Sequence, residues 1–162
     1  IQVHHIAGAV RRYANAGNRA FAPDWWGKGE PLFISATFRN HVRGSIGKIR
    51  NVYFDHIRMD AESCIFVRGE KDDNIQNVCF QDLEIIMKKQ GTQAAGFFDE
   101  QPSERGVYEH EIPAMYVQNA KDIQVKNMRV CWTEDRDSKW TSGIQTVNCQ
   151  NIRVDGLEES VR

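Results

Sequence analysis

The chain has 162 residues, and its 21 basic and 22 acidic side chains give a formal net charge of −1. One domain is expected at this length, and 41 % hydrophobic residues are enough for a core, which argues against global disorder. The balanced charge gives no bulk attraction to nucleic acid or to an anionic membrane, and no apolar run approaches the ~20 residues of a membrane helix. No signal-peptide pattern is visible at Ile1, and we expect neither nucleic-acid binding nor membrane insertion.

A pattern of apolar–x–apolar–x–x–apolar residues recurs along the chain. Five copies begin at Ile1, Val52, Val78, Ile123 and Ile152. A polar turn former directly precedes four of them: Asn51, Asn77, Asp122 and Asn151. The step from Val52 to Val78 is 26 residues, which suits one coil of a stacked β-structure, and the longer steps fit one coil plus an insertion.

A second apolar segment lies between successive copies. These facing segments are Leu32–Ala36, Cys64–Val67, Ala114–Val117 and Gly143–Val147. Alternation with a period of two, rich in β-branched and aromatic residues, predicts strands, whereas the signals of leucine-rich helical repeats and of hairpin-linked sandwiches are missing. The sequence therefore predicts a parallel β-solenoid in which each coil has a motif strand and a facing strand. Polar residues before the third apolar position are expected where the chain bends: His5, His56, Asp82 and Asn127.

The first long insertion, at about residues 8–31, alternates aromatic and charged side chains. Flat rings stack on sugar faces and charged groups fix hydroxyls or carboxylates, so this composition suits a carbohydrate site. The alternative is that the tryptophans pack the insertion onto the solenoid wall. The candidate substrate-binding residues here are Trp25, Trp26, Lys28 and Glu30.

The second insertion, at about residues 88–112, is long for a connection without regular structure, and such loops often carry function. Its candidate binding residues are Asp99, Arg105 and His110. Two alternatives stay open: salt-bridged surface charge, or a loop that simply covers the side of the solenoid.

Charged residues also follow the facing strands. Arg39 and Arg68 come after successive facing strands, so the stacking of coils is expected to bring them near each other. Two arginines there would suit bidentate capture of a uronate carboxylate, and Glu70 is a further candidate for the same groove.

No complete catalytic set is recognisable, because the nucleophile elbow, the P-loop and the HExxH motif are all missing. No catalytic residue is therefore assigned. The neighbours His4 and His5 are expected to point to opposite faces of a strand, which argues against a shared metal site. The four cysteines lack CxxC spacing, so no metal or other cofactor is expected. We interpret them as mostly buried free thiols, with one disulfide left open.

The repeats resemble a known family. The string IGKIRNVYFDHIRMDAESCIFVRG (residues 46–69) is similar to coils of glycoside hydrolase family 28, the polygalacturonases and their rhamnogalacturonan-cleaving relatives. Residues 25–36, 97–117 and 126–135, together with Trp140, resemble segments of pectinase-like members of the family. The resemblance covers essentially the whole chain.

The resemblance implies a right-handed parallel β-helix, here partial, with about four coils and two long insertions in one domain over residues 1–162. It also implies a secreted or periplasmic enzyme that degrades pectin by hydrolysing glycosidic bonds. The family's catalytic aspartates precede the region matched here, so we expect them upstream of this chain. The chain would then be the C-terminal part of such an enzyme, supplying one side of a groove for a pectic or related polysaccharide and inactive by itself.

Two other functions remain open. One is a non-catalytic β-helix that binds polysaccharide without cutting it. The other is a structural piece that associates with the missing N-terminal coils, or with itself, through open coil ends.

Overall fold

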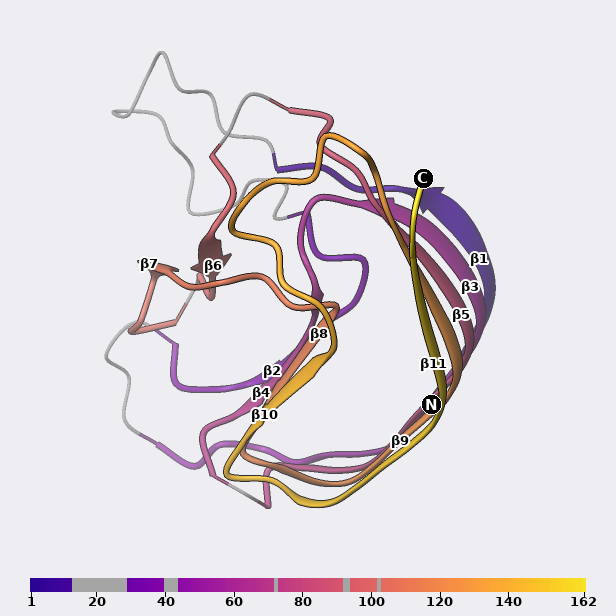
Figure 1. The fold of residues 1–162 in the computed structure, drawn as a ribbon. Helices are drawn as coiled ribbons and strands as arrows, with labels where there is room; N and C mark the ends of the chain where they lie inside the picture. The colour runs from indigo at the N-terminus through magenta and orange to yellow at the C-terminus, as the bar shows by residue number, and fades with distance from the viewer. Residues whose placement is uncertain (13–28, 40–43, 72, 92–93, 102) are drawn as a thin grey trace.

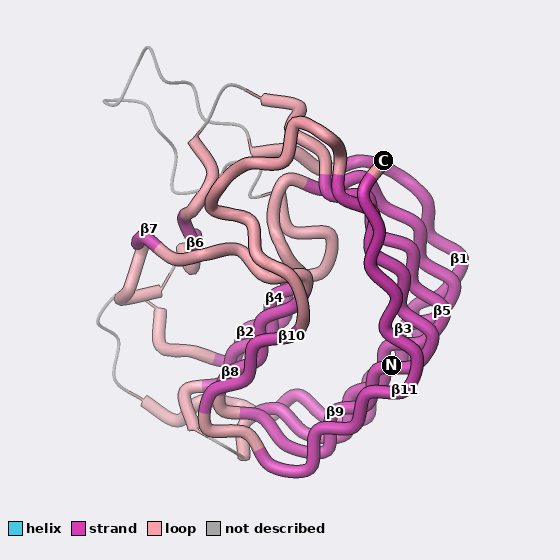
Figure 2. The backbone as a smooth tube through the Cα atoms, in the orientation of Figure 1, coloured by secondary structure: helices cyan, strands magenta, loops and turns pink. Residues whose placement is uncertain are grey.

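The structure is a computed structural model that describes residues 1–162 apart from 13–28, 40–43, 72, 92–93 and 102. The described residues form strands joined by loops (Figures 1 and 2). The strands are β1 (Gln2–Ala9), β2 (Phe33–Ala36), β3 (Ile49–Ala61), β4 (Ile65–Gly69), β5 (Ile75–Met87), β6 (Phe97–Asp99), β7 (Val107–Glu109), β8 (Met115–Gln118), β9 (Ala120–Trp132), β10 (Ile144–Val147) and β11 (Gln150–Val161). Within these described parts, no helix is long and apolar enough to cross a membrane.

Two parallel sheets hold the strands of successive repeats. One sheet has the order β1-β3-β5-β9-β11 and the other has the order β2-β4-β8-β10, while β6 and β7 form a small antiparallel pair. Figure 1 shows the chain passing from one sheet to the other in each repeat, so that equivalent strands stack on one another. The predicted all-β class and the parallel stacking are confirmed, and the arrangement is β-helix-like.

The predicted motif copies lie side by side in the five-stranded sheet. One row of side chains at the second motif position runs through all five strands: Val3, Phe54, Phe80, Val125 and Val154. The four predicted facing segments overlap β2, β4, β8 and β10. The register that the repeats predict is therefore the register of the sheets.

The two-residue gap in the motif has a cause in the backbone. β3, β5 and β9 curve around a corner (Figure 2), and the residue before the third apolar position has a positive φ: 51° at His56, 52° at Asp82 and 49° at Asn127. Side chains of a regular strand alternate between its two faces. One left-handed residue shifts that alternation, so Phe54 and Ile57 are both buried although they are three positions apart. The predicted bends are thus confirmed.

His4 and His5 correct one prediction. His5 has a φ of 57°, and the two Nδ1 atoms lie 2.9 Å apart. The expectation that these side chains point to opposite faces is wrong, because the alternation of a regular strand does not hold across a left-handed residue.

A second set of left-handed residues lies where turn formers precede the motif. Asparagine and aspartate tolerate this conformation better than most residues. Their side chains also connect neighbouring coils: Asn77 Nδ2 donates to Asn51 Oδ1 at 2.7 Å, and Asn151 Nδ2 donates to Asp122 Oδ1 at 2.6 Å. These polar ladders align the coils from outside.

The core fills the space between the two parallel sheets. Phe54 and Phe80 stack with ring centroids 5.2 Å apart, and burying a side chain of this size stabilises the fold by ~1.5–3 kcal/mol. Burial decreases in the outermost strands, where Ile6 of β1 is 40 % exposed and Val161 of β11 is 64 % exposed. Apolar side chains at both ends of the stack are therefore in contact with solvent.

All four cysteines are free. Cys64 and Cys131 are buried, and Cys79 and Cys149 are half-buried. Burial raises the pKa of the Cys64 and Cys79 thiols. The interpretation as free thiols is confirmed, and the structure contains none of the disulfides that the sequence left open.

Candidate functional site

The outer face of the four-stranded sheet carries an aromatic row beside a polar row. The aromatic row is Phe33, Phe66 and Tyr116, and the polar row is Ser35, Arg68 and Gln118. Both point away from the core because they alternate along the strands with inward residues such as Val67. Neighbouring rings stack at centroid distances of 5.1 and 5.6 Å. The strands thus hold flat apolar groups next to hydrogen-bonding groups.

The pair β6–β7 covers the middle of this face. It lies on the side of the four-stranded sheet that faces away from the five-stranded sheet (Figure 1). The ring of Phe98 packs against Phe66 at 5.1 Å and against Tyr116 at 4.8 Å, and His110 stacks on Phe98 at 4.2 Å. The second insertion therefore covers the side of the stack, which was one of the alternatives for it.

Glu100 is the centre of a charged cluster under this cover. Its side chain is fully buried, Arg68 Nη1 donates to Oε2 at 2.7 Å, and Arg105 Nη1 donates to Oε1 at 3.2 Å. The hydroxyl of Tyr108 also donates to Oε1, and Ser103 Oγ lies 3.4 Å from Oε2. Burial raises the pKa of Tyr108, and the hydrogen bond to Glu100 raises it further. The cluster joins β4 to the insertion.

Arg105 brings this cluster to the surface. Its side chain is 40 % exposed, and its guanidinium carbon lies 4.1 Å from the centroid of the Tyr108 ring. Arg105 Nη1 also donates to Gln118 Oε1 at 3.3 Å, and the same oxygen accepts a hydrogen bond from Tyr116 at 3.0 Å. Stacking and ion pairing hold the guanidinium in one place, so it offers a positioned cation beside an amide and two aromatic rings.

Four predicted binding residues meet at this cluster: Arg68, Glu70, Arg105 and His110. Glu70 Oε2 lies 3.7 Å from Arg68 Nη2, and His110 reaches the cluster through its stacking on Phe98. Arg68 is only 7 % exposed, so its role is to hold Glu100, while Arg105 is the accessible arginine.

The remaining predicted residues lie elsewhere. Trp25, Trp26 and Lys28 fall outside the described residues. Glu30 is buried just before β2. Asp99 is also buried, and its Oδ1 accepts a hydrogen bond from the backbone N–H of Gln101 at 2.9 Å, which stabilises the turn after β6.

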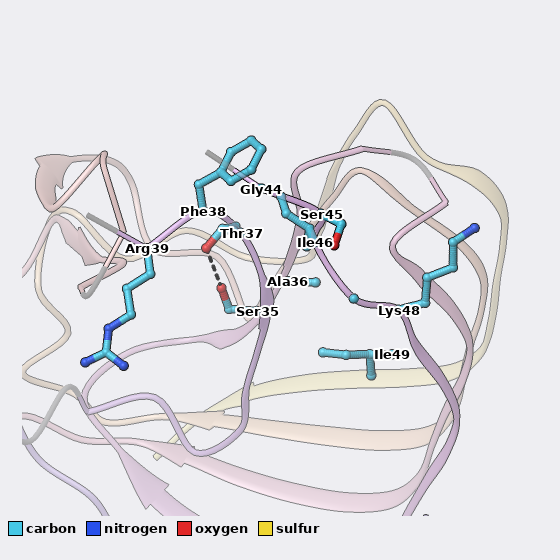
Figure 3. Close-up of a pocket in the computed structure, with 11 residues that line it drawn as sticks. Ser35, Ala36, Thr37, Phe38, Arg39, Gly44, Ser45, Ile46, Lys48 and Ile49 are labelled. Atoms are coloured by element: carbon cyan, nitrogen blue, oxygen red, sulfur yellow. Dashed lines mark hydrogen bonds between the residues drawn. The ribbon is translucent and has the colours of Figure 1, made fainter. Parts of the chain in front are cut away.

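Arg39 and Arg68 are not neighbours in the register. β2 pairs with β4 so that Ser35, four residues before Arg39, lies beside Arg68. Arg39 instead lines an open hollow of about 410 Å³ at the end of β2, with Lys48 on the opposite side (Figure 3). Ser35 Oγ and Thr37 Oγ1 hydrogen-bond at 3.0 Å in its wall. Ser35 belongs to the polar row, whereas Ala36, Ile46 and Ile49 belong to or pack against the core, so the hollow borders both the outer face and the end of the core.

The central residues of the cluster were missed in the sequence. Glu100, Tyr108 and Gln118 belong to no motif. Glu100 and Gln118 lie beside Arg68 of β4, far away in the chain, and Tyr108 joins the cluster through Glu100. Arg68 was a signal in the sequence for such a cluster. A charged residue that follows an apolar strand needs an oppositely charged partner if the fold buries it. Comparisons of the chain with protein-family models, curated proteins and solved structures find no match.

Proposed function

We propose that the chain is part of a right-handed parallel β-helix whose four-stranded sheet supplies one side of a groove for a pectic or related acidic polysaccharide. The observation that carries the proposal is the outward Arg105 guanidinium, which is held by Glu100 and Gln118 beside the rings of Tyr108 and Tyr116. A polysaccharide of this kind is extracellular, so the complete protein would be secreted or periplasmic.

The chemistry of uronates fits these groups. A sugar carboxylate accepts charge-assisted hydrogen bonds from arginine, and its ring hydroxyls exchange hydrogen bonds with amide and phenol groups. Aromatic side chains supply flat apolar surfaces on which the C–H faces of sugars pack. Phe33 and Tyr108 are the accessible rings here, because Phe66 and Tyr116 are buried under β6–β7. The hollow that Arg39 lines lies further along β2, and Lys48 on its other side is paired with Asp73.

The cluster supports binding better than catalysis. Glycosidic hydrolysis uses two carboxyl groups on either side of the scissile bond, one of which gives up a proton. Glu100 is fully buried, and two arginines and a tyrosine surround it, so it has a structural function. We therefore propose a substrate-binding role for this chain, with the catalytic aspartates in other coils of the complete hydrolase. The buried and fully engaged Glu100 also favours the alternative of a non-catalytic polysaccharide-binding β-helix.

The test is calorimetry with oligogalacturonates on the wild-type chain and on Arg105→Ala. Losing a hydrogen bond to a charged group costs ~1.5–3 kcal/mol, so the affinity should fall by ~10–100-fold. Arg105→Lys keeps the charge and loses the planar fork, and it should bind with intermediate affinity. A neutral oligosaccharide of the same length should bind more weakly to the wild-type chain.

Arg129→Ala is the matched control, because Arg129 is an exposed arginine of β9 paired with Glu158 at 3.2 Å. It should bind oligogalacturonates like the wild type. Unchanged affinity in Arg105→Ala, or equal loss in both variants, would contradict the proposed site. Circular dichroism of each variant separates lost binding from lost folding.

A further inference from the structure

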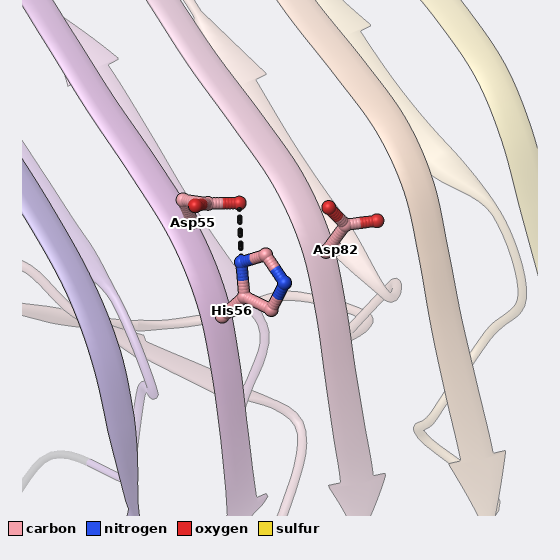
Figure 4. Close-up of side chains that lie close together, drawn as sticks. All are labelled: Asp55, His56 and Asp82. Atoms are coloured by element: carbon pink, nitrogen blue, oxygen red, sulfur yellow. Dashed lines mark ion pairs between the residues drawn. The ribbon is translucent and has the colours of Figure 1, made fainter.

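A second group of polar side chains lies on the outer corner of the five-stranded sheet, away from the proposed groove. The bend residues form a row across the strands: His5 in β1, His56 in β3, Asp82 in β5 and Asn127 in β9. Their positive φ angles interrupt the strand alternation, so sequence neighbours such as Asp55 and His56 approach each other. Figure 4 shows Asp55 and His56 of β3 directed toward each other, with Asp82 beside them on β5.

This group brings three potential metal ligands close together. Asp55, His56 and Asp82 each offer one ligand atom, and these three atoms lie within 4.8 Å of one another. His56 Nδ1 is 2.8 Å from Asp55 Oδ1. Two atoms bound to one ion at ~2.1 Å lie ~3.0 Å apart at a right angle and ~3.4 Å apart at the tetrahedral angle usual for Zn²⁺, so these two atoms have to move apart by a few tenths of an ångström to bind one ion.

The carboxylate of Asp55 lies directly beside the imidazole of His56. Its Oδ1 is enclosed and forms an ion pair with His56 Nδ1 at 2.8 Å. An ion bound by both groups would take the place of the proton in this pair, because metal ligands are deprotonated.

Neighbouring side chains orient the other two groups. Asn127 Nδ2 donates to Asp82 Oδ1, and Gln81 Nε2 donates to Asp82 Oδ2 at 3.2 Å. The ring of His5 stacks on the ring of His56 at 5.2 Å, with the planes 10° apart. Partners of this kind fix ligand orientation in metal sites.

The surroundings leave space for an ion and its water. A hollow of about 300 Å³ lies beside His56 and Asp82. Arg129, which also lines this hollow, is paired with Glu158 at 3.2 Å, and Arg58, close to His56 in the chain, is paired with Glu84 at 3.4 Å. Their positive charge is thus partly compensated.

We propose that Asp55, His56 and Asp82 bind a divalent first-row transition-metal ion, for which Zn²⁺ is the probe. One imidazole nitrogen and two carboxylate oxygens form a mixed donor set that such ions accept, and their charge balances the two aspartates. His56 is 56 % exposed on its side chain, so water fills the remaining coordination positions. The ion would tie β3 to β5 at the corner of the stack.

The experiment is a calorimetric titration of Zn²⁺ into the full chain and three variants. His56→Asn and Asp82→Asn remove ligands but keep a residue type that Asn127 shows to be accepted at this left-handed position. One Zn²⁺ should bind per wild-type chain, and each of these variants should lose ~10-fold or more in affinity. His4→Gln is the control and should bind like the wild type.

Two results would overturn the proposal. One is a wild-type chain that binds no Zn²⁺, or whose binding survives in both His56→Asn and Asp82→Asn. The other is loss of binding in His4→Gln alone, which would assign the ion to the close His4–His5 pair. Circular dichroism and thermal melting establish that each variant is folded.

Discussion

Replacing Glu100 with glutamine should destabilise the fold strongly, because it removes one charge from a buried ion pair. The Glu100 side chain is fully buried, and Arg68, 9 % exposed on its side chain, lies 2.7 Å away. Breaking such a pair leaves an uncompensated buried charge and costs ~3–5 kcal/mol. Glu70, 3.7 Å from Arg68, compensates part of that charge, so we expect the lower end, about 3 kcal/mol.

For a domain of this size a loss of about 3 kcal/mol lowers the melting temperature by ~6–12 °C. Urea denaturation and thermal melting, followed by circular dichroism, measure both quantities. Glu158→Gln is the control, because the Arg129–Glu158 pair is 57 % and 72 % exposed and such pairs contribute at most ~1 kcal/mol. Equal destabilisation in the two variants, or a loss of unfolding free energy under ~1 kcal/mol in Glu100→Gln, would refute the claim that the substitution leaves the charge of Arg68 buried and unpaired.

Three further predictions concern the ladder, the core and alkaline pH. Asn77 has a φ of 52°, a left-handed conformation that alanine disfavours and glycine accepts. Asn77→Ala should therefore lower the unfolding free energy in urea denaturation by ~1–2 kcal/mol, and Asn77→Gly should lower it less. The reverse order would contradict the role of the left-handed backbone. Phe80→Ala should lower the unfolding free energy by ~3–5 kcal/mol, because the Phe80 ring is fully buried and stacks on Phe54. Phe33→Ala should lower it clearly less, because the Phe33 side chain is exposed to solvent. Similar losses in the two variants would argue against the assigned inner and outer faces. The raised pKa of Tyr108 gives stability that is complete below pH ~10 and is lost as the pH rises, because the unfolded phenol ionises first. Tyr108→Phe should therefore weaken the fall in unfolding free energy above pH ~10, and an unchanged slope would show that Tyr108 does not titrate with unfolding.

The stacking of the strands could be read from the sequence because its determinants are local. An inward side chain at every second position, with one extra residue at each bend, produces the pattern that begins at Val52 and Val78, and these two residues pair in the structure. The turn formers Asn51 and Asn77 were visible for the same reason, since the residue type reflects the φ angle of its own position.

The site was only partly predictable, because its contacts depend on the path of the second insertion. Arg105 was recognised as a chemical group, but no local pattern indicates that Glu100 rather than Asp99 reaches Arg68. The antiparallel pair β6–β7 depends on Phe98 packing against Phe66, a contact between residues far apart in the chain. The register of β2 places Ser35, and not Arg39, beside Arg68, and the order of the strands alone does not determine this register.

Residues 49–74 make up one complete turn of the stack, because Ile49 at the start of this segment pairs with Ile75, which follows its end. The segment contains one motif strand and one facing strand, and β3 already has a parallel neighbour on each side. A tandem duplication of these residues would therefore present matching edges to both neighbours and lengthen the stack by one turn. Extra residues of any other length have to leave the stack, as the segment that carries β6 and β7 does. The molecule can thus grow along its axis only in whole turns, while variation in its loops leaves the cross-section unchanged.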